Sequence, residues 1–145
     1  MFDATEMNFD CEACERSFKK NIFGLDRRFE RVEFEASKYV IHVDEFDGLR
    51  CYCSENCMRT HFPREMAAQG IPIPHRRPVV GPVEVCARCR GPVDMTRYHL
   101  AFILDEWEVL PEGGGQTLWD ECVAVVCTTC VPMGSTASWL SMRVR

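Results

Sequence analysis

Eight of the ten cysteines form two sets of four that repeat at a nearly constant offset along the chain. The offset is 75 positions from Cys11 to Cys86 and from Cys14 to Cys89, 74 from Cys53 to Cys127, and 73 from Cys57 to Cys130. Two short loops that each present a pair of thiolates can close a tetrahedral shell around a zinc ion. The sequence therefore predicts two structural zinc ions, the first held by Cys11, Cys14, Cys53 and Cys57 and the second by Cys86, Cys89, Cys127 and Cys130.

The repeat divides the 145 residues into two units, each too small to rely on a hydrophobic core alone. Units of roughly 60–70 residues bury so little surface that they are only marginally stable, so we expect a bound metal ion to stabilise each unit. Disulfides are the other use of paired cysteines, but the acidic start of the chain lacks the basic and apolar regions of a secretion signal. Apolar runs are far shorter than the ~20 residues that cross a bilayer. We therefore expect a cytoplasmic protein with reduced thiols and no membrane association.

A proline-rich stretch marks the expected joint between the units. Residues 70–82 read GIPIPHRRPVVGP, and the prolines disfavour both helix and interior strand. The predicted organisation is a first zinc module over residues 1–69, a linker over 70–82 and a second zinc module over 83–145. The predicted fold class is a small, metal-stabilised α+β protein with two tandem modules built on β-hairpins with short helices.

The first unit contains a strand signal between its two cysteine pairs. Residues 29–35 alternate in character, and residues 39–43 are rich in residues that favour strands, so together they predict a hairpin. After the hairpin, Ser54 is a good N-cap for a helix that runs toward Thr60. Pro63 is expected to start a second short turn that reaches Gln69. The second cysteine pair would then lie at a helix N-terminus, where the helix dipole favours thiolates.

In the first unit, a short turn that presents two cysteines (a zinc knuckle) is followed by a hairpin and then by a helix that carries the second cysteine pair. This is the order of elements in a treble-clef zinc finger. Within residues 11–62 the motif resembles the FCS-type fingers of the TRASH and MYM families, on the residues Cys11, Cys14, Phe18, Tyr52, Cys53, Ser54, Glu55, Asn56, Cys57 and Phe62. The resemblance implies zinc bound by four cysteines in an interaction or metal-handling module. This chain departs from the family pattern by Tyr52 in place of phenylalanine and by the extra thiol of Cys51.

The second unit repeats this order with a more strand-rich sequence. Two strand-like pieces in residues 98–110 are followed by a glycine turn at 112–115 and a β-rich run over 117–126. Residues 135–144 are compatible with a short helix or with a third strand. A helix would make this module a second treble clef, and a strand would make it a zinc ribbon, which the β-rich flanks slightly favour.

Three further side chains could replace a ligand. Cys51 and Cys122 lie outside the repeat and are expected to be small buried residues. His61 follows Cys57 by one helical turn and could displace a thiolate, although the complete quartet leaves no vacancy.

Enzymatic motifs are missing from the sequence. Zinc deaminases pair a His-x-Glu motif with Pro-Cys-x-x-Cys, but here the nearest approach is His42-Val-Asp and no proline precedes a knuckle. Four thiolates also leave no open position for an activated water. We expect a protein without catalytic activity and without a small-molecule substrate.

Binding functions remain. A protein-interaction adaptor is favoured, with tryptophans as the anchoring side chains: Trp107, Trp119 and Trp139. A nucleic-acid binder would instead use its basic clusters, namely Lys19, Lys20, Arg27, Arg28, Arg31, His75, Arg76 and Arg77. The net charge of −5 argues against phosphate binding. A third possibility is metal sensing or trafficking, with Cys51 or Cys122 as an entry ligand.

Overall fold

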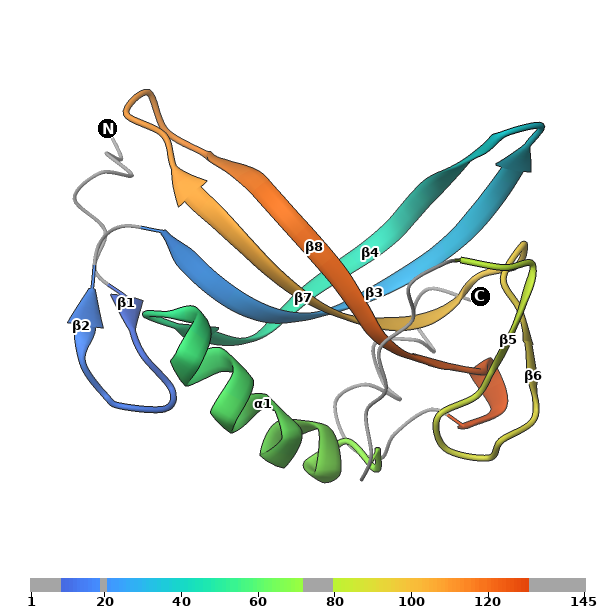
Figure 1. The fold of residues 1–145 in the computed structure, drawn as a ribbon, viewed down its shortest axis with the longest axis horizontal. Helices are drawn as coiled ribbons and strands as arrows, with labels where there is room; N and C mark the ends of the chain where they lie inside the picture. Colours follow the sequence, from blue (N-terminus) through green and yellow to red (C-terminus); the bar gives the residue numbers. More distant parts are fainter. Residues whose placement is uncertain (1–8, 19–20, 72–79, 131–145) are drawn as a thin grey trace.

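Two long antiparallel hairpins form the centre of the protein (Figure 1). The computed structural model describes residues 9–18, 21–71 and 80–130. The first hairpin consists of β3 (Ile22–Glu35) and β4 (Lys38–Tyr52), and the second of β7 (His99–Val109) and β8 (Gly115–Val126). They join through β3 and β7 into a four-stranded sheet in the order β4-β3-β7-β8. Among the described residues the fold is therefore small and α+β, with a β-hairpin framework as expected from the sequence.

The strands of the first hairpin are much longer than their sequence signal. Residues 29–35 and 39–43 do lie in paired strands, but β3 begins at Ile22 and β4 continues to Tyr52. Charged residues in β3 interrupt its apolar pattern and conceal this extension. In the structure these charges have partners: Arg27 forms an ion pair with Asp47 across the hairpin, and Arg28 lies 2.9 Å from Glu30. Burial of polar groups within a strand requires such pairing.

The second hairpin follows its prediction closely. The two strand-like pieces of residues 98–110 form the single strand β7, and the predicted glycine turn connects it to β8. Gly113 and Gly114 both have positive φ angles, 101° and 78°, which glycine adopts at little cost. The conformational freedom of these glycines thus determines where the chain reverses direction in this hairpin.

The pairing of β3 with β7 joins strands from both cysteine units in one sheet. The register runs from Ile22 opposite Trp107 to Glu30 opposite His99. The division into modules 1–69 and 83–145 stays a prediction, and most of the expected linker, residues 72–79, lies outside the described residues. The pairing nevertheless means that the two units share hydrogen bonds and a core.

Helix α1 (Glu55–Ala68) lies against one side of this sheet (Figure 1). Its N-cap is Ser54, as predicted, and the Ser54 hydroxyl accepts a hydrogen bond from the backbone N–H of Cys57 at 3.1 Å. The prediction of a short helix followed by a separate turn at Pro63 was wrong, because the helix continues through this proline. Met58 and Met66 lie on either side of Pro63 and are fully buried, so tertiary packing holds both halves of the helix in place despite the lost backbone bond.

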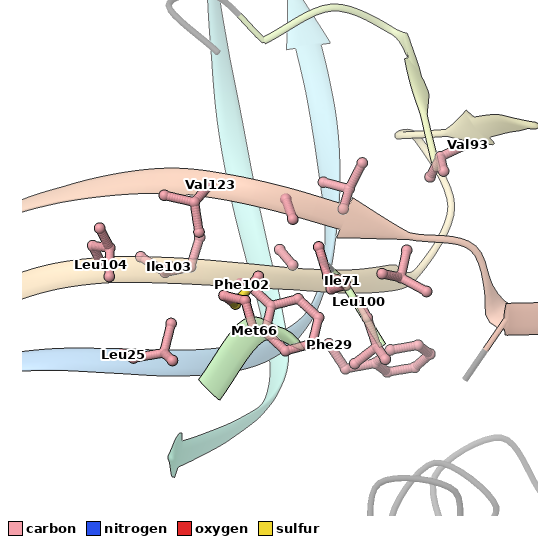
Figure 2. Packing of buried hydrophobic residues seen from close by; sticks show 14 of the residues in the cluster. Leu25, Phe29, Met66, Ile71, Val93, Leu100, Phe102, Ile103, Leu104 and Val123 are labelled. Carbon is pink, nitrogen blue, oxygen red and sulfur yellow. The ribbon is translucent and has the colours of Figure 1, made fainter. Parts of the chain in front are cut away.

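The main core fills the space between α1 and the sheet (Figure 2). Leu25 of β3, Phe102 and Leu104 of β7, Met66 of α1 and Ile71 belong to this one cluster, and all five are fully buried. Strand alternation places Leu25 on the α1 side and its neighbours Gly24 and Asp26 on the opposite side.

Candidate metal centres

The first cysteine quartet forms where a short hairpin meets the end of β4. Cys11 and Cys14 lie in the turn between β1 (Phe9–Asp10) and β2 (Ser17–Phe18). Cys53 directly follows β4, and Cys57 lies in the first turn of α1. The four sulfur atoms all lie within 4.8 Å of one another. The structure thus brings together the four residues that the sequence grouped.

The second quartet occupies the corresponding place in the other unit. Cys86 and Cys89 lie in the turn between β5 (Val83–Val85) and β6 (Pro92–Asp94). Cys127 follows β8, and Cys130 ends the 3-10 turn η2 (Thr128–Cys130). These sulfur atoms also lie within 4.8 Å of one another.

The two knuckles have the same backbone structure. In the first, the N–H of Cys11 donates to Arg16 and the N–H of Glu15 donates back to Cys11, both at 2.9 Å. In the second, Cys86 donates to Gly91 at 2.8 Å and Arg90 donates to Cys86 at 3.0 Å. The positive φ angles, 64° at Glu15 and 67° at Arg90, are 75 positions apart.

Each knuckle is tied to its hairpin by one equivalent bond. The N–H of Glu12 donates to the carbonyl of Cys51 in β4, and the N–H of Ala87 donates to the carbonyl of Val125 in β8, both at 2.9 Å. The sequence repeat of the cysteines is therefore also a repeat of local structure.

The sulfur spacing fits a tetrahedral metal ion. A tetrahedral shell with metal–sulfur bonds of about 2.3 Å places its sulfur atoms about 3.8 Å apart. The distances are 3.6 Å from Cys14 to Cys53, 3.8 Å from Cys53 to Cys57, and 3.8 Å from Cys89 to Cys127. The cysteines in the described part of the chain form no disulfide. Both quartets can therefore hold a metal ion.

The thiols within each quartet differ in pKa, and a bound cation would allow all four to be ionised together. Burial raises the pKa of Cys11, but backbone N–H groups, including those of Cys14 and Cys53, outweigh it and lower the pKa to about 7. Similar N–H bonds outweigh burial at Cys86 and lower its pKa to about 6. By contrast, burial and hydrogen bonds with neighbouring thiols raise the pKa of Cys53 to about 12. Four thiolates so close together need a bound cation to be ionised at once.

The three alternative ligands lie outside both quartets. Cys51 donates its S–H to the carbonyl of Asp10 at 3.4 Å, and Cys122 donates to the carbonyl of Ala124 at 3.5 Å. The ring of His61 hydrogen-bonds through Nδ1 to the hydroxyl of Tyr52 at 2.8 Å. None of the three is needed to complete a shell of four.

The residues considered for partner binding are scattered. Trp107 and Trp119 are half-buried at the far end of the second hairpin, where Trp119 donates to Glu106 at 2.8 Å. Arg27 is buried, and Arg28 is largely covered and ion-paired. Lys19, Lys20, residues 75–77 and Trp139 lie outside the described residues.

Sequence reasoning missed a pair of buried carboxyl groups in the sheet, Asp26 of β3 and Asp105 of β7. Each directly follows a short apolar run in its strand, residues 22–25 (IFGL) in β3 and residues 100–104 (LAFIL) in β7. An acidic residue at the end of such an apolar run was the available signal, because burial of a carboxyl group in a strand costs free energy unless another interaction compensates it.

Within the described residues, no helix has both the length and the apolar character needed to cross a membrane. Comparison with family models, curated proteins and solved structures found no match to this chain. The resemblance to FCS-type fingers accordingly stays a prediction.

Proposed function

We propose that the protein is a non-catalytic adaptor in which two structural zinc ions hold a β-sheet that binds a protein partner. The observation that carries this proposal is the closed character of both quartets, each with four sulfur atoms within 4.8 Å. Closed shells of four thiolates are typical of structural zinc, whereas catalytic zinc keeps a position for water or substrate.

The β3–β4 hairpin supplies the best candidate surface for the partner. It extends away from α1 and from the second hairpin (Figure 1). Five large apolar side chains are exposed along it: Phe34, Tyr39, Val40, Val43 and Phe46. Because β4 lies at an edge of the sheet, its outer side can also accept the backbone of an added strand. Exposed apolar groups beside an open strand edge suit an extended segment of another protein.

Nucleic-acid binding draws less support. Arg27 is committed to Asp47 and Gln69, and Arg28 to Glu30 and Asp120. Arginines that already neutralise carboxylates contribute little to phosphate binding, and the net charge of −5 works in the same direction.

Two measurements test the proposal. Native mass spectrometry with elemental analysis should find two zinc ions per chain, and an iron–sulfur chromophore would overturn the zinc assignment. For the partner, a photo-crosslinking amino acid replaces Tyr39 on β4 or, as the matched control, Leu118 on the opposite edge strand β8. We expect a protein crosslink specific to position 39. Crosslinks to nucleic acid, or no difference between the two positions, would contradict the adaptor function.

A further inference from the structure

A pocket of about 550 Å³ opens on the sheet face opposite Leu25 and α1. Strands β3, β4 and β7 line it, together with Phe9 of β1 and with Gly115 and Thr117 at the start of β8. This volume is within the range of sites that bind small ligands or single anchoring side chains. Three lining positions, Gly24, Gly48 and Gly115, have no side chain, which helps to keep the space open.

The floor of the pocket is the carboxyl pair of Asp26 and Asp105. These residues are only 6% and 8% exposed, yet both line the pocket. Gly24 lies directly opposite Asp105 in the sheet, and a Cβ atom at Gly24 would come within 2.7 Å of Asp105 Oδ1. The absence of a side chain at position 24 thus makes room for this carboxyl group.

The pair has unused capacity to accept hydrogen bonds. The Oδ1 atoms of Asp26 and Asp105 face the same small space, since a Cβ atom at Gly24 would lie 3.5 Å from the first and 2.7 Å from the second. Two carboxyl groups in one site favour the state in which one of them carries a proton. Burial, followed by the interaction with Asp26, raises the pKa of Asp105 to about 9. Oδ1 of Asp105 is buried and has no hydrogen-bond partner among the described residues. A buried acceptor in this state favours a ligand that brings N–H donors and positive charge.

The arginine near the pair is engaged by other carboxylates, since Arg28 lies 2.9 Å from Glu30 and 3.5 Å from Asp120. Arg28 lowers the pKa of both carboxyls, while Asp47 raises that of Asp26 and Asp120 raises that of Asp105. Glu12 and Arg50 also line the pocket, but Arg50 lies 3.1 Å from Glu65 on α1. Since Arg28 and Arg50 are both paired with other carboxylates, the carboxyl pair at the floor favours an added cation.

The walls of the pocket are aromatic. Phe9 and Trp107 meet edge to face with ring centroids 6.1 Å apart. Phe46 of β4 also lines the pocket, with 59% of its surface exposed. Gly115 allows the Trp107 ring to lie against the strand, because a Cβ atom there would come within 2.3 Å of the ring. Aromatic faces attract organic cations and bury apolar stems.

A hard metal ion fits this site less well. Calcium takes six to eight oxygen ligands, and magnesium needs an octahedral set. Within the described part of the chain, the two cysteine quartets are the clusters able to hold a metal, and Asp26 and Asp105 are not joined by a third ligand.

We propose that this pocket binds an alkylammonium group on an apolar stem, with the ammonium between Asp26 and Asp105 and the stem against Trp107 and Phe46. The carboxyl pair lies outside both cysteine quartets, but the pocket shares Phe46 with the exposed surface of the β3–β4 hairpin and Glu12 with the first cysteine turn, so the proposal rests on the zinc-stabilised sheet of the proposed function. A lysine side chain of a partner and a free amine share this chemistry, and the experiment distinguishes them.

The test is an NMR titration of the zinc-loaded protein near pH 7 with phenethylamine, with an N-acetyl-lysine amide and with phenethyl alcohol as the neutral analogue. We expect the amides of Gly24, Gly48 and Gly115 to shift with a dissociation constant of about millimolar for an amine of so few atoms. The alcohol should bind at least about tenfold more weakly, because it cannot form charged hydrogen bonds. Tighter binding of the lysine compound would identify a partner's side chain as the source, and tighter binding of phenethylamine a free amine.

Variants show whether the carboxyl pair is responsible. Asp105→Asn keeps the shape of the side chain and should weaken amine binding at least about tenfold. The matched control Asp120→Asn alters the residue opposite Asp105 that lies outside this pocket, and should change binding by no more than about twofold. If Asp105→Asn does not fold, Phe46→Ala at the exposed wall should still weaken binding severalfold. Equal binding of amine and alcohol, unchanged binding in both pocket variants, or no binding of either amine would overturn the proposal.

Discussion

The two cysteine quartets share a knuckle but differ in what their second cysteine pair controls. Around Cys11 and Cys86 the same backbone bonds recur, with the same tie to the hairpin. The later cysteines differ. Cys53 and Cys57 are four positions apart at the start of the helix α1, whereas Cys127 and Cys130 are three apart, with Cys127 directly after β8 and Cys130 at the end of the short turn η2.

The two units thus share a metal-binding element, but the structure that this element holds in place differs between them. In the first unit a metal would fix the N-terminus of a 14-residue helix that buries Met58 and Met66 against the sheet. In the second unit it would fix a three-residue turn at the end of β8. Loss of the first metal should therefore disturb more of the core than loss of the second.

The largest expected effect is that of removing both metals. Structural zinc contributes about 10–16 kcal/mol in small domains, which equals or exceeds a typical total stability of about 5–15 kcal/mol. We expect a strong chelator to abolish dispersed amide signals in NMR spectra, and added zinc to restore them. Retention of the dispersed spectrum after complete metal removal would show that the sheet is stable without its metal ions.

Single-ligand variants should reveal the difference between the quartets. Cys57→Ser and Cys130→Ser should each lower the metal content from two ions to one, but only Cys57→Ser should markedly reduce the helical circular dichroism signal, because α1 begins beside Cys57. Cys51→Ser is the control and should retain both ions, since Cys51 lies outside the quartets. An equal loss of helical signal in both ligand variants would mean that disruption of the second quartet also unfolds α1 through the shared sheet.

A core substitution tests the helix without touching a ligand. Met66→Ala removes a fully buried side chain between α1 and the sheet and should cost about 2–5 kcal/mol of unfolding free energy. Urea unfolding gives this quantity, and the variant should still bind two metal ions. If stability were unchanged, the contribution of α1 packing to the core would have to be rejected.

The smallest effect is expected at the helix cap. Ser54→Ala removes the acceptor for the Cys57 N–H and should cost about 1 kcal/mol. Thr128→Ala, an exposed substitution in η2, is the matched control in the second unit and should change stability by less than about 0.5 kcal/mol. Comparable losses of unfolding free energy at the two positions would contradict a larger contribution from the Ser54 cap than from the turn η2.

Several features of this protein could be predicted from its sequence because they depend on local chemistry. Cysteine spacing grouped the same eight residues that the structure assembles into two quartets. Ser54 identified the start of α1, and the glycines at 113–115 identified the turn of the second hairpin. These features depend on a few neighbouring residues, which is why one sequence was enough to predict them.

Long-range pairing decided the rest. The extension of β3 through its charged residues, the continuation of α1 across Pro63 and the joining of β3 to β7 all depend on partners far away in the chain. The pocket above Asp26 and Asp105 arises in the same way, because its two carboxyl groups are 79 positions apart and meet only in the completed sheet. The sequence by itself determined where metal ligands and turns lie, since sulfur spacing and backbone preference act locally. Tertiary structure alone decided which charges are buried together, because burial is a property of the assembled sheet.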